Sequence, residues 1–361
     1  MQDQESHELQ PFSAWMQESL YGEGGYYHST SRVGKDGDFY TSVSVSKFFG
    51  GGIANFILSL LENGQLSLPL EIVEIGADKA LLLRDIADFL TALSQGVIKH
   101  TTFATLEPLK SLSHTQQNTQ IPNFRIYENF TQLQEHGSEK KSIFFVSNEL
   151  FDSFGVDIFD NTQMLFVQDF SLRWLPIPQA QKVLQNCKNF ALQSAFLDNL
   201  LRQKSLDSLS GAYCPFLPPF IDNVAKCVKN VQNAYFLTFD YDKNSSLNPR
   251  SFVRSYANHQ VFSFEDIQTM GLKSFYKCAD MTADVDFDFV RELFRHNGAN
   301  ELFYLPQNRA LIEKMGILEL LEIFSQNAQN THYLREIAKV KSLLDPQILG
   351  ERFKCVCFCL L

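Results

Sequence analysis

Two predicted strands of this sequence are followed by residues that could bind a nucleotide. Residues 70–85 read LEIVEIGADKALLLRD, an apolar run broken by Glu74, then a turn at Gly76, then leucines at helical spacing. A strand, a glycine turn and a helix form the first half of a nucleotide-binding βαβ unit, whose loop offers backbone N–H groups to an anionic group. The next predicted strand, 102–106, ends in Glu107, where an acid would hold the two hydroxyls of a ribose.

This nucleotide fingerprint is incomplete, because Asp78 and Ala80 stand where further small residues are usual. The alternative is a βα unit of an α/β protein that binds no nucleotide. An NAD-dependent dehydrogenase would begin in the same way, but the chain lacks a convincing glycine fingerprint for one and nothing elsewhere in the sequence supports it.

A second group of polar side chains follows the clearest buried strand. Residues 142–146, SIFFV, predict a parallel strand, and Asn148, Glu149 and Asp152 come soon after it. Ligands of an open parallel sheet bind beyond the carboxyl ends of its strands, where the strand order reverses. We expect the first and fourth strands to flank that point. Carboxylates there either cap the next element or take part in chemistry.

A third candidate is the early polar stretch 33–42, VGKDGDFYTS. Gly37 and Asp38, with Thr41 and Ser42, supply small and hydrogen-bonding groups. A long polar loop this early in a compact domain is often functional, and a surface turn is the alternative.

The order of the elements must position these loops. Strands and helices alternate, and a strand at 354–361 follows the last helix. That order predicts an α/β fold, with a Rossmann-like, seven-stranded, mostly parallel sheet and helices on both faces. We expect an N-terminal helical cap and site-covering loop in residues 1–65. Residues 66–361 then form the α/β domain, with a β-hairpin and helical insertion after the fourth strand at about 156–232.

Two segments outside the predicted sheet are less regular. Within the insertion, residues 179–203 are predicted to be helical. After the fifth predicted strand, 234–239, a polar loop is predicted to run as far as Arg254, Tyr256 and His259.

The composition excludes several classes of protein. The chain has 361 residues, 45% of them hydrophobic and 20% charged, which is typical of a globular protein. Its net charge of −10 argues against a duplex nucleic acid as partner, although it permits an acidic pocket for a cationic substrate. The sequence has no apolar run of about 20 residues and begins with a polar, acidic segment unlike a signal or transit peptide. We therefore expect a soluble cytoplasmic protein without a membrane span.

Seven scattered cysteines indicate reduced thiols. Cys355, Cys357 and Cys359 would lie on one face of a strand, about 6.5–7 Å apart. One zinc ion needs sulfur atoms at about 2.3 Å, so an extended strand cannot offer all three. We predict no metal site and expect these cysteines to act as small buried hydrophobic side chains.

Several segments together resemble one family, the class I methyltransferase-like proteins that include the mitochondrial complex I assembly arginine methyltransferase and its bacterial relatives. The matching segments are FSAWMQESLY, GDFYTSVSVSKFFGGGIA, EIVEIGADKALLLRDI, NELFDSFGV, FVRSYANH, DMTADVDF and LLDPQILGERFK. They run almost from end to end, and GDFYTS and NELFD are fairly specific. The resemblance implies S-adenosylmethionine as cofactor and methyl transfer, with a protein arginine as acceptor in the best-understood member.

The resemblance also assigns roles to residues. Those that match the family's cofactor contacts are Asp38, Thr41, Ser42, Glu74, Gly76, Ala77, Asp78, Glu107 and Asn148. Glu149 and Asp152 match the acidic loop beside the methyl donor, and we expect this pair to hold an acceptor guanidinium planar and favour its nucleophilic form. His259 is the alternative base.

The chain departs from the family pattern in its glycine loop. Asp78 and Ala80 replace the second and third glycines, Asp242 replaces a glycine after the fifth strand, and Asp284 stands where the family commonly has His. If the Asp78 carboxylate lies about 4 Å from the cofactor's own carboxylate, the repulsion costs about 4 kcal/mol, or a thousandfold in affinity.

Two hypotheses therefore remain open. One is an active methyltransferase, and the other is a catalytically degenerate methyltransferase fold that acts as a binding or assembly factor. Both predict a protein as substrate or partner, and neither fixes the oligomeric state.

Overall fold

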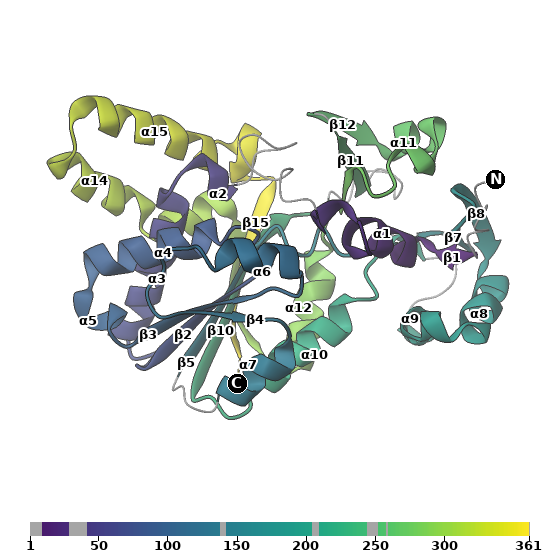
Figure 1. Cartoon of the computed structure of the whole chain (residues 1–361), viewed down its shortest axis with the longest axis horizontal. Helices are drawn as coiled ribbons and strands as arrows, with labels where there is room; N and C mark the ends of the chain where they lie inside the picture. The colour runs from purple at the N-terminus through teal and green to yellow at the C-terminus, as the bar shows by residue number, and fades with distance from the viewer. Residues whose placement is uncertain are drawn as a thin grey trace.

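The computed structural model describes most of the chain, namely residues 9–28, 42–137, 142–203, 209–243, 252–257 and 259–360. Figure 1 shows an α/β body at one end of an elongated molecule and a lobe of strands and helices at the other. Helix α1 (Phe12–Tyr21) lies between them. In this described part of the chain, no helix is long and apolar enough to cross a membrane.

Seven strands form the central sheet of the α/β body. They are β2 (Leu70–Ile75), β3 (Thr101–Leu106), β4 (Phe124–Tyr127), β5 (Ser142–Asn148), β10 (Asn233–Tyr241), β14 (Asn300–Pro306) and β15 (Phe353–Leu360). Their order in the sheet is β14–β15–β10–β5–β2–β3–β4. Strand β15 is antiparallel to both its neighbours, and the pairs from β10 to β4 are parallel. The predicted seven-stranded, mostly parallel sheet is confirmed.

Helices cover both faces of this sheet, as predicted. Neighbouring residues of a buried strand point to opposite faces, so Ile72 belongs to one hydrophobic core and Val73 to the other. The core around Ile72 is covered by α3 (Phe48–Glu62), α4 (Leu81–Leu93), α14 (Ile317–Asn327) and α15 (Asn330–Leu344). The core around Val73 is covered by α7 (Phe130–Gly137), α10 (Leu217–Cys227) and α12 (Phe287–His296). Short helical segments complete the body: α2 (Ser42–Val45), α5 (Gln95–Ile98), α6 (Lys110–Gln116), α13 (Gln307–Arg309), and π-helical turns at Ala310–Lys314 and Pro346–Gly350.

The three C-terminal cysteines lie on β15. Cys355 and Cys357 are fully buried and pack in the same core as Ile72, while Cys359 is half-buried. They pair with β10 opposite Phe239, Leu237 and Tyr235. Cys355 and Cys357 therefore act as small buried hydrophobic side chains, as the sequence predicted.

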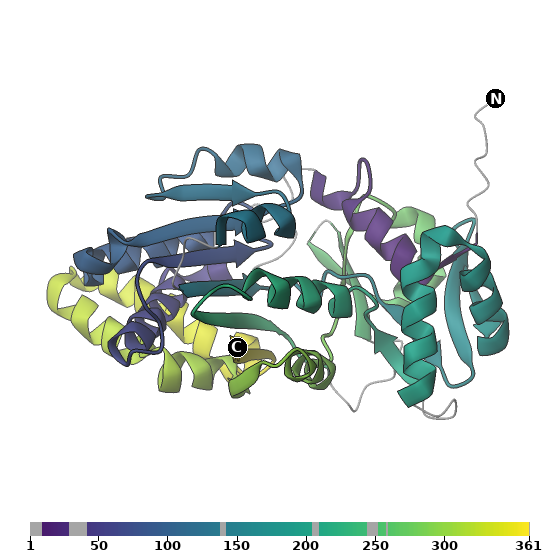
Figure 2. The ribbon, with the colours of Figure 1, turned by 90° about the horizontal axis from the view of Figure 1, so that it is seen from below.

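The lobe contains a second sheet with both insertion and N-terminal residues. Its strands are β1 (Gln10–Pro11), β6 (Asp157–Asp160), β7 (Gln163–Gln168), β8 (Ser171–Pro176) and β9 (Ser210–Tyr213), with helices α8 (Ile177–Asn186) and α9 (Ala191–Gln203). Figure 2 shows these two helices on the outer side of the lobe. The predicted helical character of residues 179–203 is confirmed for most of the range, although the chain leaves helical geometry at Cys187 and forms a 3-10 turn at Lys188–Phe190 between the two helices.

A third, small sheet lies above α1 in Figure 1. It consists of β11 (Val253–Ala257), β12 (Gln260–Ser263) and β13 (Asp280–Ala283), with α11 (Phe264–Met270) after β12. The prediction of a polar loop as far as His259 is therefore wrong for residues 253–257, which form strand β11. The strand is short and mostly polar, and it is held by pairing with β13, which comes later in the chain. The division between residues 65 and 66 stays a prediction.

Candidate active site

Three strand ends bring predicted site residues to the carboxyl edge of the central sheet. Strand β2 is followed by Gly76 and β3 by Glu107, while β5 ends at Asn148 with Glu149 next. Strand β3 lies on one side of β2 and β5 on the other, so the strand order reverses at β2. This is the position at which open α/β sheets bind ligands.

The loop between β2 and α4 keeps a glycine-type backbone without the glycines. Gly76, Asp78 and Ala80 have φ of 71°, 44° and 54°, all in the left-handed region. That region costs a residue with a Cβ atom about 1–2 kcal/mol. A Cβ on Gly76 would lie 2.8 Å from Leu150 Cδ1, so this position also lacks room for a side chain. The backbone N–H of Ala80 donates to Ala77 O at 2.6 Å and closes the turn.

Glu74 has a structural partner inside the protein. Its Oε2 accepts a hydrogen bond from the backbone N–H of Leu83 at 3.0 Å, in the first turn of α4. The N-cap residue, Ala80, has no side chain that could do this. Burial raises the pKa of Glu74 to about 8, although the Leu83 hydrogen bond opposes the shift. Glu74 therefore caps the helix that follows the glycine loop.

Glu107 lies beside the altered glycine loop. Its Oε1 accepts from the backbone N–H of Leu109 at 3.0 Å. Gln116 ties the two loops together, because its Nε2 donates to Asp78 O at 2.8 Å and its Oε1 accepts from Thr105 Oγ1 at 2.6 Å. Burial, and then the negative charge of Asp78, raise the pKa of Glu107 to about 7. Asp78 is half-buried, and its negative charge raises the pKa of Glu107, the predicted ribose-binding acid.

Glu149 is held in one orientation by its neighbours. Asn148 Nδ2 donates to Glu149 Oε1 at 2.8 Å, and the Glu149 backbone N–H donates to Phe239 O at 2.9 Å. Its φ of 52° is left-handed. Burial raises the pKa of Glu149 to about 8, with the Asn148 hydrogen bond opposing this shift. Asn148 Oδ1 is buried and has no hydrogen-bond partner among the described residues.

The third predicted group is described only at Ser42. Asp38 and Thr41 lie outside the described residues. Ser42 begins α2, and its Oγ donates to Gln307 Oε1 at 3.0 Å. Its backbone also hydrogen-bonds to the Glu149 carboxylate. Ser42, the last residue of the early polar stretch, therefore lies beside the acidic loop after β5.

Asp152 belongs to a group of five carboxylates, which we call the acidic cluster. Its members are Glu149, Asp152, Asp240, Asp280 and Asp284. Asp152 is only 4% exposed, and its carboxylate receives no hydrogen bond from any described residue. Burial and the other four negative charges raise its pKa well above the usual range. Arg254 forms an ion pair with Asp284.

Sequence reasoning missed Asp240, which holds the loop of Glu149 and Asp152. Asp240 Oδ2 accepts from the backbone N–H groups of Phe151 at 2.8 Å and Asp152 at 3.4 Å, and its Oδ1 accepts from Tyr241 N at 2.8 Å. The signal available in the sequence was its place at the end of the fifth strand. Asp240 is a positioning residue, because it acts through the backbone of the neighbouring loop.

We expect Asp240→Ala to lower the free energy of unfolding by about 2 kcal/mol, because the buried N–H groups of Phe151 and Asp152 lose their acceptor. Chemical denaturation would measure this change. Asp240→Asn keeps an acceptor oxygen and is the control, with a smaller expected loss. An Asp240→Ala protein as stable as the parent would contradict the role given to Asp240.

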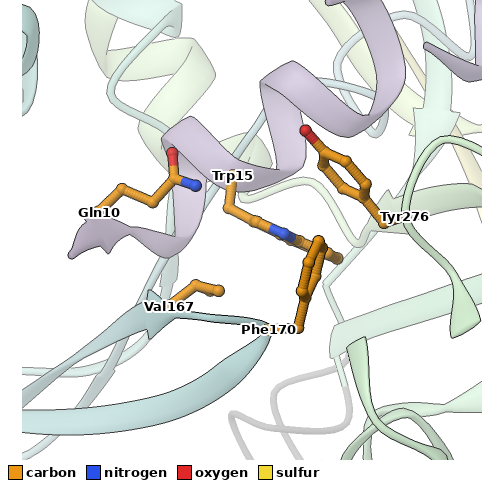
Figure 3. A pocket seen from close by; sticks show the side chains of 5 residues that line it. All are labelled: Gln10, Trp15, Val167, Phe170 and Tyr276. Atoms are coloured by element: carbon orange, nitrogen blue, oxygen red, sulfur yellow. The ribbon is translucent and has the colours of Figure 1, made fainter. Parts of the chain in front are cut away.

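Figure 3 shows a hollow of a different kind, between α1 and the turn that joins β7 and β8. Trp15, Phe170 and Tyr276 line it, together with Gln10 and Val167. None of the predicted site residues lies there. The described residues contain no group of three His, Cys, Asp or Glu side chains suited to holding one metal ion.

Comparison with known proteins agrees with this geometry. The chain is 24% identical over 355 residues to rat "Protein arginine methyltransferase NDUFAF7, mitochondrial", which covers 91% of this chain and 76% of the relative. The human protein of that name is 22% identical over 359 residues, covering 91% and 75%. A crystal structure from Burkholderia thailandensis, bound to S-adenosyl-homocysteine, has the same fold with a TM-score of 0.73, at 21% identity and coverage of 97% of this chain and 87% of that one.

A family model gives the assignment directly. The family described as putative S-adenosyl-L-methionine-dependent methyltransferase matches residues 53–305, which is well over half of the chain. The matched region contains the glycine loop, Glu107 and the whole acidic cluster. This chain belongs to that family of S-adenosylmethionine-dependent methyltransferases.

Proposed function

We propose that this protein transfers a methyl group from S-adenosylmethionine to an arginine side chain of a protein. The observation that carries the proposal is the acidic cluster after β5, whose carboxyl groups have one ion pair among the described residues, from Arg254 to Asp284, and whose raised pKa values leave them ready to ionise when a cation binds. Buried charges require a partner of opposite sign, and a guanidinium is the cation that carboxylates bind in a planar, bidentate way. The names of the rat and human relatives support the same acceptor.

The residues at the sheet edge fit the cofactor in their chemistry. Gly76 is exposed, and its lack of a side chain leaves the loop backbone open to an approaching ligand. Glu107 would accept from ribose hydroxyls, and Asn148 offers a buried Oδ1 to a donor. Loop residues Ala77 and Asp78, and Ser42 with Asp38 and Thr41 before it, complete the predicted contacts. When bound, S-adenosylmethionine supplies an electrophilic methyl group on a positively charged sulfur.

Glu149 and Asp152 are the residues that act on the acceptor arginine. An arginine side chain is protonated in solution, so its nucleophilic form must be favoured in the site. The two carboxylates would fix the guanidinium plane and so orient the acceptor nitrogen, which reduces the entropic part of the barrier. With a cationic guanidinium bound beside it, Glu149 would be ionised and would accept the proton that the acceptor nitrogen loses on methylation.

A binding or assembly role without methyl transfer is the second candidate. The half-buried Asp78 beside Glu107 favours it, because a like charge there weakens cofactor binding. In either case the proposed partner is a protein. The cytoplasmic location also stays a proposal for this chain, since the relatives are named mitochondrial; fractionation of the source cells with an antibody would test it.

Calorimetric titration with S-adenosylmethionine and S-adenosylhomocysteine, followed by mass spectrometry of proteins incubated with the enzyme and cofactor, tests the proposal. We expect micromolar binding and mass increases of one or two methyl groups on arginine. Absence of binding up to millimolar cofactor would refute methyl transfer and favour the assembly role. Binding with methylation of another residue type would refute the arginine acceptor.

The raised pKa values predict opposite pH responses for folding and for binding. Glu107 and Glu149 are protonated in the ligand-free folded protein up to pH values near their pKa of about 7 and about 8, and they ionise near 4.5 when unfolded. Stability should therefore fall as the pH rises from about 5 to 8, since unfolding releases protons there. Affinity for cationic ligands should rise over the upper part of this range. Thermal unfolding and calorimetry at several pH values would measure both, and a parallel trend would contradict the assignment.

A further inference from the structure

Each carboxylate of the acidic cluster except Asp152 has a partner. Asp240 accepts backbone N–H groups, Glu149 accepts from Asn148, and Asp284 pairs with Arg254. Asp280 Oδ1 accepts from Tyr27 Oη at 2.9 Å and from its neighbour's backbone N–H. The buried Asp152, with no donor among the described residues, is the member that most requires a cationic ligand.

Asp280 reaches the cluster from outside the α/β body. It is the first residue of β13, in the small third sheet, and it is fully buried. Further along the same strand, the backbone N–H of Ala283 donates to Asp152 O at 2.8 Å. This hydrogen bond joins the third sheet to the loop that carries Asp152.

Two tyrosines, Tyr21 at the end of α1 and Tyr27 in the turn after it, make a second connection between the loop of Asp152 and Asp280. Tyr21 Oη donates to Ser153 Oγ at 2.6 Å, next to Asp152, and Tyr27 Oη donates to Asp280. The two rings stack with their centroids 5.1 Å apart. A continuous chain of contacts therefore runs from Ser153 through both tyrosines to Asp280.

We propose that Asp280 is a specificity-determining residue, which together with Asp152 binds the acceptor guanidinium between the α/β body and the third sheet. This inference rests on the proposed arginine acceptor and divides the roles within the site. Glu149 is the group that accepts the proton, and Asp152 and Asp280 hold the guanidinium.

The test uses the full-length protein saturated with S-adenosylhomocysteine, and N-acetyl-arginine amide as a minimal guanidinium probe. Its uncharged counterpart, N-acetyl-citrulline amide, is the matched ligand control. We expect Asp280→Asn to weaken arginine-probe binding about thirtyfold or more and to leave cofactor affinity unchanged within about twofold. The parent should not bind the citrulline probe measurably.

Two further variants separate a direct effect on binding of the arginine probe from a general effect on the fold. Asp157→Asn changes another buried lobe carboxylate, which accepts from Ser13 N at 3.1 Å and lies outside the cluster, so probe binding should be unchanged. Tyr27→Phe keeps the Asp280 charge but removes its hydroxyl donor, and a smaller loss is expected. Thermal unfolding of every variant would reveal any that fails to fold.

The outcomes distinguish this inference from the proposed function. If the parent binds the arginine probe and Asp280→Asn binds it equally well, Asp280 has no role in the acceptor site and the inference is overturned. If Asp280→Asn loses cofactor affinity instead, Asp280 belongs to the cofactor side and the inference also fails. If the parent binds the cofactor but binds the arginine probe no better than the citrulline probe, both the arginine acceptor and the inference are overturned.

Discussion

Replacing Glu149 with glutamine is expected to lower the rate of methyl transfer at saturating substrates by about a hundredfold or more. Glutamine keeps the size of the side chain and its hydrogen bond with Asn148, but it cannot take a proton from the guanidinium. Proton transfer to a positioned side chain is worth about 10²–10⁴ in rate. Cofactor affinity should change little, because Glu149 acts on the reacting group.

Single-turnover kinetics would measure this effect, with the unmethylated form of an acceptor protein that mass spectrometry has identified. Glu71→Gln is the matched control. Glu71 is a fully buried glutamate on β2 that accepts a hydrogen bond from Tyr127 Oη at 2.9 Å, and it lies outside the acidic cluster. Full activity of Glu149→Gln would show that another group accepts the proton.

The second large effect is expected at the altered glycine loop. Asp78→Gly should strengthen S-adenosylmethionine binding about ten- to a hundredfold. Two like charges about 4 Å apart cost about 4 kcal/mol at an effective dielectric near 20, and partial exposure with Lys79 nearby reduces this to about 1.5–3 kcal/mol. Glycine also relieves the left-handed strain at this position, where φ is 44°.

Calorimetry on two related variants separates charge from backbone strain. Asp78→Asn removes the charge and tolerates left-handed geometry, so it should recover most of the affinity gain. Ala80→Gly relieves strain at φ of 54° without changing charge, so its effect should appear mainly in stability. If Asp78→Gly binds no more tightly than the parent, the Asp78 carboxylate does not oppose the cofactor.

The central sheet could be predicted because its strands are buried on both faces. Such strands need continuous apolar runs, and the runs before Gly76 and after residue 141 are short and bounded by polar residues. The glycine turn and the acids that follow β3 and β5 were found for the same reason, since each comes directly after a recognisable strand. The seven-stranded order then followed from the alternation of strands and helices.

The small third sheet and the start of α10 could not be predicted locally. Strand β11 has few apolar residues and depends on pairing with β13, a contact between distant parts of the chain. Helix α10 begins at Leu217 with Pro218 and Pro219 in its first turn, where proline is tolerated because those N–H groups have no helical acceptor.

Reading the sequence alone was enough to predict the fold and the edge of the sheet where a ligand would bind, and it identified Glu149 and Asp152 as candidate site residues. That Asp240 and Asp280 lie with this pair in the acidic cluster became visible only in the folded chain. Parallel pairing of β10 with β5 brings Asp240 to the loop, and the hydrogen bond from Ala283 to Asp152 O brings the third sheet against it. These contacts connect residues about 90 to 130 positions apart, and a local pattern carries no record of pairing over such separations.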